Sequence, residues 1–248
     1  MNVTLAYIEE PPFGWTSERQ MAIGADIELA EAVLEAIGVT RIQYRLTTFS
    51  ELLPGVREGR WDMNVPLFVT AERSKEVAFS LPVWGIGDGL LVRAGNPKAL
   101  DSYAAVAARD DARLGIIAGQ VQHDSAKAAG VRDDQLLVFT EQREAIDALR
   151  SGAIDAYAST ALGNRIVSDR IGLEQFEAVA CRPAMGAAPS TPLGAFSFGK
   201  DNRGLLDAVN KQLRAYLGSP DHIARMGKYG LGKDEIEPSL RAIRTDPA

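Results

Sequence analysis

Short runs of β-branched and apolar residues alternate along the chain with segments whose apolar positions recur at helical spacing. This alternation predicts an α/β protein. In the first region, strands are expected at Val3–Ile8, Arg41–Leu46 and Met63–Val65, and helices at Asp26–Ile37 and Ser50–Gly59. Gly38 follows the first of these helices as a stop signal, and Ser50 is the expected N-cap of the second.

A further strand begins at Leu90, and the same rhythm restarts after the Gly95-Asn96-Pro97 break. This second region predicts strands at Leu114–Ile117, Leu136–Thr140 and Ile154–Ala158, and helices at Ser125–Ala129 and Gln142–Ser151. Residues 182–192 hold three prolines and several small residues, so we expect a connector there. The last elements expected are a strand at Phe196–Phe198, helices at Leu205–Leu217 and Pro220–Tyr229, and a polar tail at Arg241–Ala248.

Two such regions joined twice by the chain predict two mixed-sheet lobes connected by a two-strand hinge. We expect residues 1–91 and 194–248 to form lobe 1 and residues 92–193 to form an inserted lobe 2. A hinge between α/β lobes implies a cleft, and clefts of this kind are where ligands bind.

The composition fits an ordinary globular protein of 248 residues, with 46% hydrophobic and 24% charged residues. A formal net charge of −6 and the lack of any Lys/Arg-rich run argue against a nucleic-acid partner. A single cysteine, Cys181, excludes an intrachain disulfide, and we expect its thiol to be inert. The presence of only two histidines argues against a His-rich metal centre, and His222 is expected to face solvent.

The first expected strand follows Met1 at once, with no charged or apolar leader before it. This pattern indicates either a cytosolic protein or one whose signal peptide has been removed. No run of 18 apolar residues that could span a bilayer is present in the sequence.

Five segments resemble motifs of the polar-amino-acid family of periplasmic solute-binding proteins, the receptors of ABC importers, and they occur in the family's order. They are Gly24–Ala30, Phe49–Pro54 with Gly59–Asp62, Thr70–Pro82, Gly115–Gly119 and Ala148–Ala156. Thr70–Pro82, which reads TAERSKEVAFSLP, is the most specific of them.

This resemblance implies a bilobed type II binding-protein fold whose lobes close over one small zwitterionic ligand. It also implies a periplasmic or extracellular monomer that delivers the ligand to a membrane permease, without enzymatic activity, cofactor or metal. In the family, the arginine that here is Arg73 holds the carboxylate of the ligand. A guanidinium suits that role because it is always charged, planar and matched to a carboxylate.

Departures from the family pattern change the expected ligand. The family's ammonium-binding Asp falls on Thr160, whose hydroxyl cannot neutralise an ammonium, and the hydroxyl pair of lobe 2 becomes Gln120-Val121. The hydroxyl-rich strand end before Arg73 becomes Val65-Pro66 and Phe68. The site is therefore expected to be more apolar than that of an amino-acid receptor, with Gln120 and Thr160 as closing hydrogen-bond partners.

Three aromatic residues fall at ligand-facing positions of the family: Phe13, Phe49 and Phe68. With the carboxylate of Glu10 they predict a box for a delocalised or alkylated cation, because ring faces attract weakly hydrated cations. Such boxes are typical of receptors for ectoine-like and betaine-like solutes. The rings could equally be core residues, Phe49 more so than Phe13; Trp15 or Trp84 could replace one of them, and Glu9 could replace Glu10.

Three alternatives remain open at this point. Arg73 could be a solvated helix residue that pairs with Glu72 or Glu76. The chain could be an enzyme resembling cyclohexadienyl dehydratases, with Glu141 or Glu10 as general acid. It could also be the sensory module of a larger receptor. The expected polar tail, in place of a linker helix, argues against this alternative.

Overall fold

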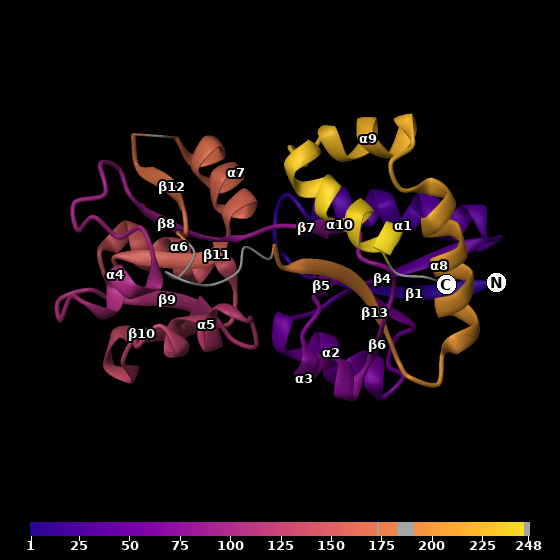
Figure 1. Ribbon diagram of the computed structural model, residues 1–248, viewed down its shortest axis with the longest axis horizontal. Helices are drawn as coiled ribbons and strands as arrows, with labels where there is room; N and C mark the ends of the chain where they lie inside the picture. The colour runs from indigo at the N-terminus through magenta and orange to yellow at the C-terminus, as the bar shows by residue number, and fades with distance from the viewer. Residues whose placement is uncertain (173, 183–190, 246–248) are drawn as a thin grey trace. The chain divides into compact units, whose positions relative to one another are not determined.

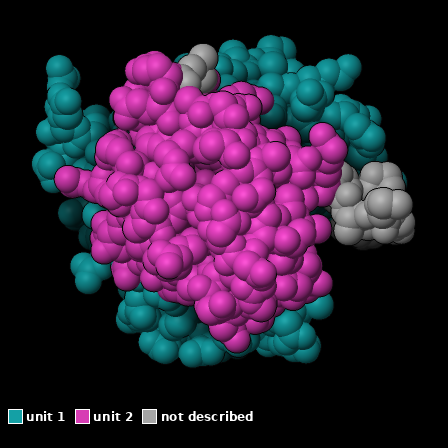
Figure 2. Space-filling view, turned by 90° about the vertical axis from the view of Figure 1, so that its left-hand side faces the viewer, with its two compact units in different colours: residues 1–86, 191–248 teal, residues 87–190 magenta. Residues whose placement is uncertain are grey.

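The computed structural model describes residues 1–172, 174–182 and 191–245. The chain forms two compact units, coloured separately in Figure 2. Unit 1 comprises Met1–Ile86 and Thr191–Ala248, and unit 2 comprises Gly87–Ser190. The first division falls before the expected residue 91 because the strand that follows it pairs only within unit 2. Residues 183–190 of the expected connector lie outside the described residues.

The main sheet of unit 1 has the strand order β4-β1-β5-β13-β6, with β7 also paired to β13. Strands β1, β4 and β5 are parallel, whereas β13 is antiparallel to β5, β6 and β7. The strands are β1 (Asn2–Tyr7), β4 (Arg41–Leu46), β5 (Met63–Phe68), β6 (Ala78–Phe79), β7 (Trp84–Gly85) and β13 (Leu193–Phe198). A separate small hairpin joins β2 (Trp15–Thr16) to β3 (Ala22–Ile23).

The helices of unit 1 pack against this sheet and against one another (Figure 1). They are α1 (Ala25–Ala36), α2 (Phe49–Arg57), α3 (Ala71–Glu76), α8 (Arg203–Tyr216), α9 (Pro220–Gly227) and α10 (Lys233–Thr245). Helix α1 packs on β5 and contacts α8 and α9, whereas α2 packs on β5 and β13. Leu52 and Val56 of α2 join Trp61 and Leu67 in a buried cluster, so Trp61 packs in the core of unit 1.

Unit 2 repeats this plan, with the strand order β10-β9-β11-β8-β12. Strands β9, β10 and β11 are parallel, β8 is antiparallel to β11, and β12 is antiparallel to β8. Its strands are β8 (Asp88–Arg93), β9 (Leu114–Ile117), β10 (Leu136–Phe139), β11 (Ala156–Thr160) and β12 (Phe176–Ala180). Its helices are α4 (Tyr103–Ala107), α5 (Gln122–Ala128), α6 (Gln142–Ser151) and α7 (Ala161–Ile171), with a 3₁₀ turn at Asp133–Gln135.

Several local expectations are wrong, and each has a physical reason. Helix α2 begins at Phe49 with Thr48 in the extended N-cap position, so Ser50 lies inside the first turn. Strand β5 continues through Pro66 to Phe68 instead of ending at Val65, because β13 pairs with it as far as Phe68.

The end of the chain also differs from expectation. Residues up to Thr245 belong to α10, which buries Ile236 and Ser239 and contacts β7, so the expected polar tail is helical in its described part. The argument against a sensory module that rested on that tail therefore has no basis. His222 is fully buried in α9, where its Nδ1 accepts a hydrogen bond from the Gly218 N–H at 3.1 Å. Within the described ranges, every helix is too short or too polar to cross a membrane.

Candidate functional site

In unit 1 the predicted ligand residues follow the carboxyl ends of the three parallel strands. Glu10 and Phe13 lie in the loop after β1, Phe49 opens the helix after β4, and Phe68 ends β5. Arg73 follows in α3. Ligands of open α/β sheets bind outside the carboxyl ends of such strands, so the topology of unit 1 gathers these residues at one edge of its sheet.

The loop after β1 is a tight turn held by its own backbone. The Glu10 N–H donates to the Gly14 carbonyl at 2.7 Å, and the Phe13 N–H donates to the Glu10 carbonyl at 2.9 Å. Gly24, just before α1, has a φ of +137°, and a Cβ there would lie 2.3 Å from the Phe13 oxygen. Only glycine allows this approach, and it brings the start of α1 directly beneath Phe13.

Phe13 and Phe68 meet through Trp84 of β7. The Trp84 ring centroid lies 5.5 Å from that of Phe13 and 5.3 Å from that of Phe68, the second pair being edge to face. Both distances suit favourable aromatic pairs. Trp84 also lies directly against Gly194 of β13, where a Cβ would come within 2.2 Å of the indole. We call Phe13, Phe68 and Trp84 the aromatic cluster.

Asp26 of α1 supports the aromatic cluster. Its Oδ1 accepts a hydrogen bond from the Trp84 indole N–H at 3.1 Å, and Asp26 is only 1% exposed. Burial raises the pKa of this carboxyl well above its usual range; the hydrogen bond from Trp84 opposes the rise and the charge of Glu10 adds to it. Asp26 thus holds the Trp84 indole from a position that solvent does not reach.

Arg73 is positioned by the end of β5 and by the cap of its own helix. Thr70 accepts a hydrogen bond from the Arg73 N–H, and the Arg73 Nη1 donates to the Phe68 carbonyl at 2.8 Å. The guanidinium lies over the Phe49 ring, 5.3 Å from its centroid. Glu72 and Glu76 were the alternative partners of Arg73. They pair with Lys75 and Arg57 respectively, each at 2.7 Å.

The three expected box rings therefore divide into two groups. Phe13 and Phe68 belong to the aromatic cluster, whereas Phe49 stacks with Arg73 and packs against the core beneath α2. The expectation that Phe13 is less buried than Phe49 is wrong, since Phe13 is 6% exposed and Phe49 only half-buried. Trp84 joins the cluster, as the sequence allowed, whereas Trp15 packs edge to face on Tyr229.

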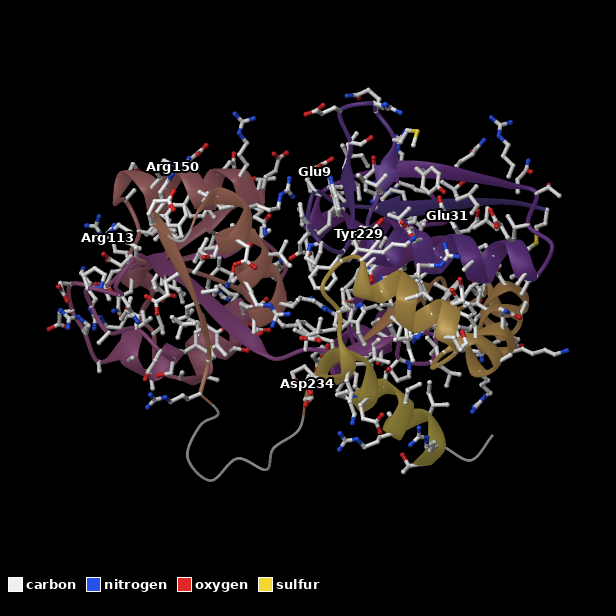
Figure 3. The ribbon with its side chains drawn as sticks, turned by 90° about the horizontal axis from the view of Figure 1, so that it is seen from above. Glu9, Glu31, Arg113, Arg150, Tyr229 and Asp234 are labelled. Atoms are coloured by element: carbon white, nitrogen blue, oxygen red, sulfur yellow. The ribbon has the colours of Figure 1, made fainter. Side chains whose placement is uncertain are left out.

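Glu9, labelled in Figure 3, has a different role from Glu10. Its carboxylate accepts hydrogen bonds from the backbone N–H and the hydroxyl of Thr16, and so ties the loop to the small hairpin. Glu10 is half-buried inside the turn. Glu10 therefore remains the better candidate for the anionic group of this edge.

In unit 2 the predicted residues again follow parallel strands. Gln120 comes after β9 in the turn before α5, and Thr160 ends β11. Both are buried, at 6% exposure. The Thr160 hydroxyl accepts the Gly163 N–H at 3.0 Å and so caps α7, which leaves its own proton available to donate elsewhere.

The sequence analysis did not select Asp88, which pairs with Thr160 across β8 and β11. The Asp88 carboxylate accepts hydrogen bonds from the Tyr103 hydroxyl and the Gln122 side chain, both at 2.8 Å. Burial raises its pKa, and the hydrogen bonds from Tyr103, Gln122 and Ser125 act against that rise. This network fixes the start of α5 next to Gln120.

Among the residues that the structure describes, the other reactive side chains form no recognisable catalytic centre. His123 and Asp124 contact each other at 3.4 Å on the surface of α5. Burial raises the pKa of the Cys181 thiol to about 12, which keeps it in the unreactive thiol form. Glu141 is exposed at the start of α6. In the part of the chain that the structure describes, no group of three or more His, Cys, Asp or Glu residues could hold a metal ion.

Comparison with known proteins gives consistent matches over nearly the whole chain. The family model of bacterial extracellular solute-binding proteins, family 3, matches residues 3–226. A probable amino-acid ABC transporter periplasmic-binding protein of Sinorhizobium fredii, y4tE, is 31% identical over 241 residues, which cover 94% of this chain and 78% of that protein.

Two solved structures share the fold. The crystal structure of EhuB in complex with hydroxyectoine has a TM-score of 0.86 and 25% identity, and the match covers 98% of this chain and 91% of EhuB. The ancestral amino acid-binding protein AncCDT-1, a precursor of cyclohexadienyl dehydratase, has a TM-score of 0.79. Its 21% identity, over 92% of this chain and 95% of that one, bears on the fold alone.

Proposed function

The chain belongs to the bacterial extracellular solute-binding proteins, family 3, and we propose that this solute receptor of an ABC importer binds a small zwitterion with an alkylated or delocalised cation. The ligand is an ectoine-like or betaine-like solute rather than an ordinary α-amino acid. Its carboxylate binds Arg73 and its cation lies against aromatic rings.

One observation carries this proposal: unit 1 gathers a guanidinium and several aromatic rings at the carboxyl edge of one sheet. Arg73 is fixed there through the Phe68 carbonyl, and Phe68 is itself a member of the aromatic cluster. A guanidinium binds a carboxylate in bidentate geometry, and ring faces attract a soft cation with about 0.5–2 kcal/mol each. A zwitterion presents both groups within one small molecule.

The type of cation follows from what the site offers. A primary ammonium has three N–H donors, and it needs a carboxylate when it leaves water. Thr160 offers a hydroxyl at the position where the family resemblance implies a carboxylate. An alkylated or delocalised cation is weakly hydrated, so ring faces and the single carboxylate of Glu10 are enough to hold it.

The similarity to EhuB, solved with hydroxyectoine, supports this ligand class. The relative y4tE, described as a probable amino-acid binding protein, supports the wider class of small amino-acid-like ligands. Compared with the family pattern, the residues at the carboxyl edge of unit 1 include more aromatic and fewer hydroxyl side chains.

Unit 2 completes the binding in this proposal. Gln120 and the free proton of the Thr160 hydroxyl bond to the ligand as unit 2 closes over it, and a permease of the importer recognises the closed form. We propose that the protein acts as an extracytoplasmic monomer. Binding without turnover is the proposed outcome, because Glu141 is exposed at a helix start and the matching family consists of solute-binding proteins.

A thermal-shift screen tests the proposal. At a ligand concentration of 100 times Kd, binding adds about 2.7 kcal/mol to the stability of the folded state, which raises Tm by about 5–10 °C in a chain of this size. We expect ectoine or glycine betaine to give this shift and the common L-amino acids to give none. A shift with L-amino acids alone would contradict the ligand class, and consumption of prephenate or arogenate would contradict the receptor function.

A further inference from the structure

We propose that Asp26 is a positioning residue for ligand recognition: through Trp84 and the Phe13 backbone, it fixes the orientation of the aromatic cluster. The inference rests on the proposed function, since it assigns Asp26 to the site that binds the zwitterion. Asp26 itself touches no ligand in this proposal. It acts through the rings that do.

Asp26 makes two bonds that converge on the cluster from α1. Its backbone N–H donates to the Phe13 carbonyl at 2.9 Å, and its Oδ1 accepts the Trp84 N–H at 3.1 Å. One residue thus holds the backbone of one ring and the side chain of another. The close approach at Gly24 makes this double contact possible, because no side chain separates α1 from the Phe13 loop.

Trp84 is the spacer between the two ligand-facing rings. It contacts Phe13 and Phe68 at centroid distances of 5.5 Å and 5.3 Å, and its back lies on Gly194. Gly194 limits how far the indole can shift, and the bond to Asp26 fixes its rotation. A rotated indole would push Phe13 or Phe68 out of place, since neighbouring rings in a packed site have no spare volume.

The same arrangement extends to the anion-binding group. The Phe68 carbonyl accepts the hydrogen bond from Arg73 Nη1 at 2.8 Å. A shift of Phe68 therefore also moves the acceptor that orients the guanidinium. One connected series of contacts therefore runs from the buried start of α1 to the carboxylate-binding group. Its members are Asp26, Trp84, Phe68 and Arg73.

Burying the Asp26 carboxyl group destabilises the folded state, which argues that the residue has a role other than stabilising the fold. Asp26 is 1% exposed, and its Oδ2 has no hydrogen-bond partner among the described residues. A buried polar atom left without a partner destabilises a fold by about 1–3 kcal/mol. An apolar residue at this position would avoid that cost but would leave the Trp84 N–H without its acceptor.

Three variants separate positioning from packing. Asp26→Asn keeps an oxygen acceptor for the indole, Asp26→Leu removes it, and Trp84→Phe keeps a ring but removes the donor. Titration calorimetry with glycine betaine and ectoine gives Kd, and thermal unfolding gives Tm. We expect Asp26→Leu and Trp84→Phe each to weaken binding about 10-fold, and Asp26→Asn to remain within about 3-fold of the wild type.

The double variant Asp26→Leu/Trp84→Phe should bind no more weakly than the worse single variant, because both changes break the same hydrogen bond. Trp61→Phe is the matched control. Trp61 is another buried tryptophan of unit 1 whose indole donates to Asn64 at 2.5 Å, outside the cluster. This control should lower Tm and leave Kd unchanged.

Unchanged Kd in folded Asp26→Leu would overturn the inference, and so would additive losses in the double variant. Failure of the wild type to bind either probe or any other zwitterion would contradict the proposed function itself. The two failures are therefore distinguishable.

Discussion

The two units share one sheet topology but place different chemistry at the carboxyl ends of their parallel strands. Unit 1 places aromatic rings and one guanidinium there, and its polar support is a buried carboxyl group behind the rings. Unit 2 places Gln120 and Thr160 there, and much of its hydrogen-bonding capacity is used internally, in the cap of α7 and the Asp88 network.

Under the proposed function, the two units contribute unequally to ligand recognition. The guanidinium and the ring faces that would select the ligand both lie in unit 1. Neutral hydrogen bonds of the kind that unit 2 offers contribute about 0.5–1.5 kcal/mol each. Substitutions in unit 1 should therefore change affinity and selectivity, whereas those in unit 2 should change affinity modestly.

The largest effect is expected for Arg73→Ala. Removing one partner of a buried ion pair costs about 3–5 kcal/mol, so Kd for the bound zwitterion should rise at least about 100-fold in calorimetry. Arg73→Lys should recover only part of the loss, because a lysine lacks the planar fork. Lys75→Ala on the exposed side of the same helix is the control and should bind normally; unchanged binding in Arg73→Ala would remove the carboxylate assignment.

Next in size are the single ring substitutions Phe13→Leu, Phe49→Leu and Phe68→Leu. Each removes a ring face while keeping apolar volume, so each should weaken binding of an alkylated cation about 3- to 30-fold. Phe196→Leu in the core of β13 is the control, and it should affect stability alone. If all three ring variants bind betaine-type solutes as the wild type does, the cation box is wrong.

The sequence predicted the parallel strands of both units, although β5 and β11 end later than expected, and it selected candidate site residues that follow these strands. Alternating apolar runs mark the parallel strands, and the Thr70–Pro82 segment marks Arg73. The contact of Trp84 with Asp26 could not be predicted in this way. It depends on the pairing of β7 with β13, which are far apart in the chain, and on the close approach at Gly24.

The burial of individual polar residues could not be predicted from the sequence either. His222 lies at a helical position that is polar by residue type, yet α9 turns it inward and its ring packs edge to face on Tyr216. Asp88 begins a strand and has no distinctive neighbour in sequence, since its partners come from α4 and α5. Such contacts arise from tertiary packing, which local periodicity does not encode.

A smaller effect is expected for Thr160→Ala in unit 2. Loss of the cap should destabilise the folded state by about 1 kcal/mol, and loss of one neutral hydrogen bond should weaken binding about 2- to 10-fold. Thr160→Ser keeps the hydroxyl and should restore both values. A loss as large as that of Arg73→Ala would contradict the unequal division between the units.

The smallest effect on binding is expected from His222, although it affects the stability of unit 1. Burial lowers the pKa of His222 to about 4 from its usual 6.5. The unfolded chain therefore binds the proton more readily, and the stabilising contribution is full above pH 6.5 and is lost as the pH falls toward 4. The raised pKa of Asp26 acts in the opposite direction, so the readout is the difference between variants: lowering the pH over this interval should reduce Tm more in the wild type than in His222→Asn. His123→Asn, an exposed control, should behave as the wild type.

The most direct test of the account is a crystal structure of the protein with its tightest zwitterion from the thermal-shift screen. We expect the ligand carboxylate within hydrogen-bond distance of the Arg73 guanidinium, and the cationic group within about 6 Å of the centroid of at least one of the rings of Phe13, Phe49 and Phe68. A ligand whose carboxylate is bound elsewhere, or whose cation contacts only carboxylates and no ring, would contradict it.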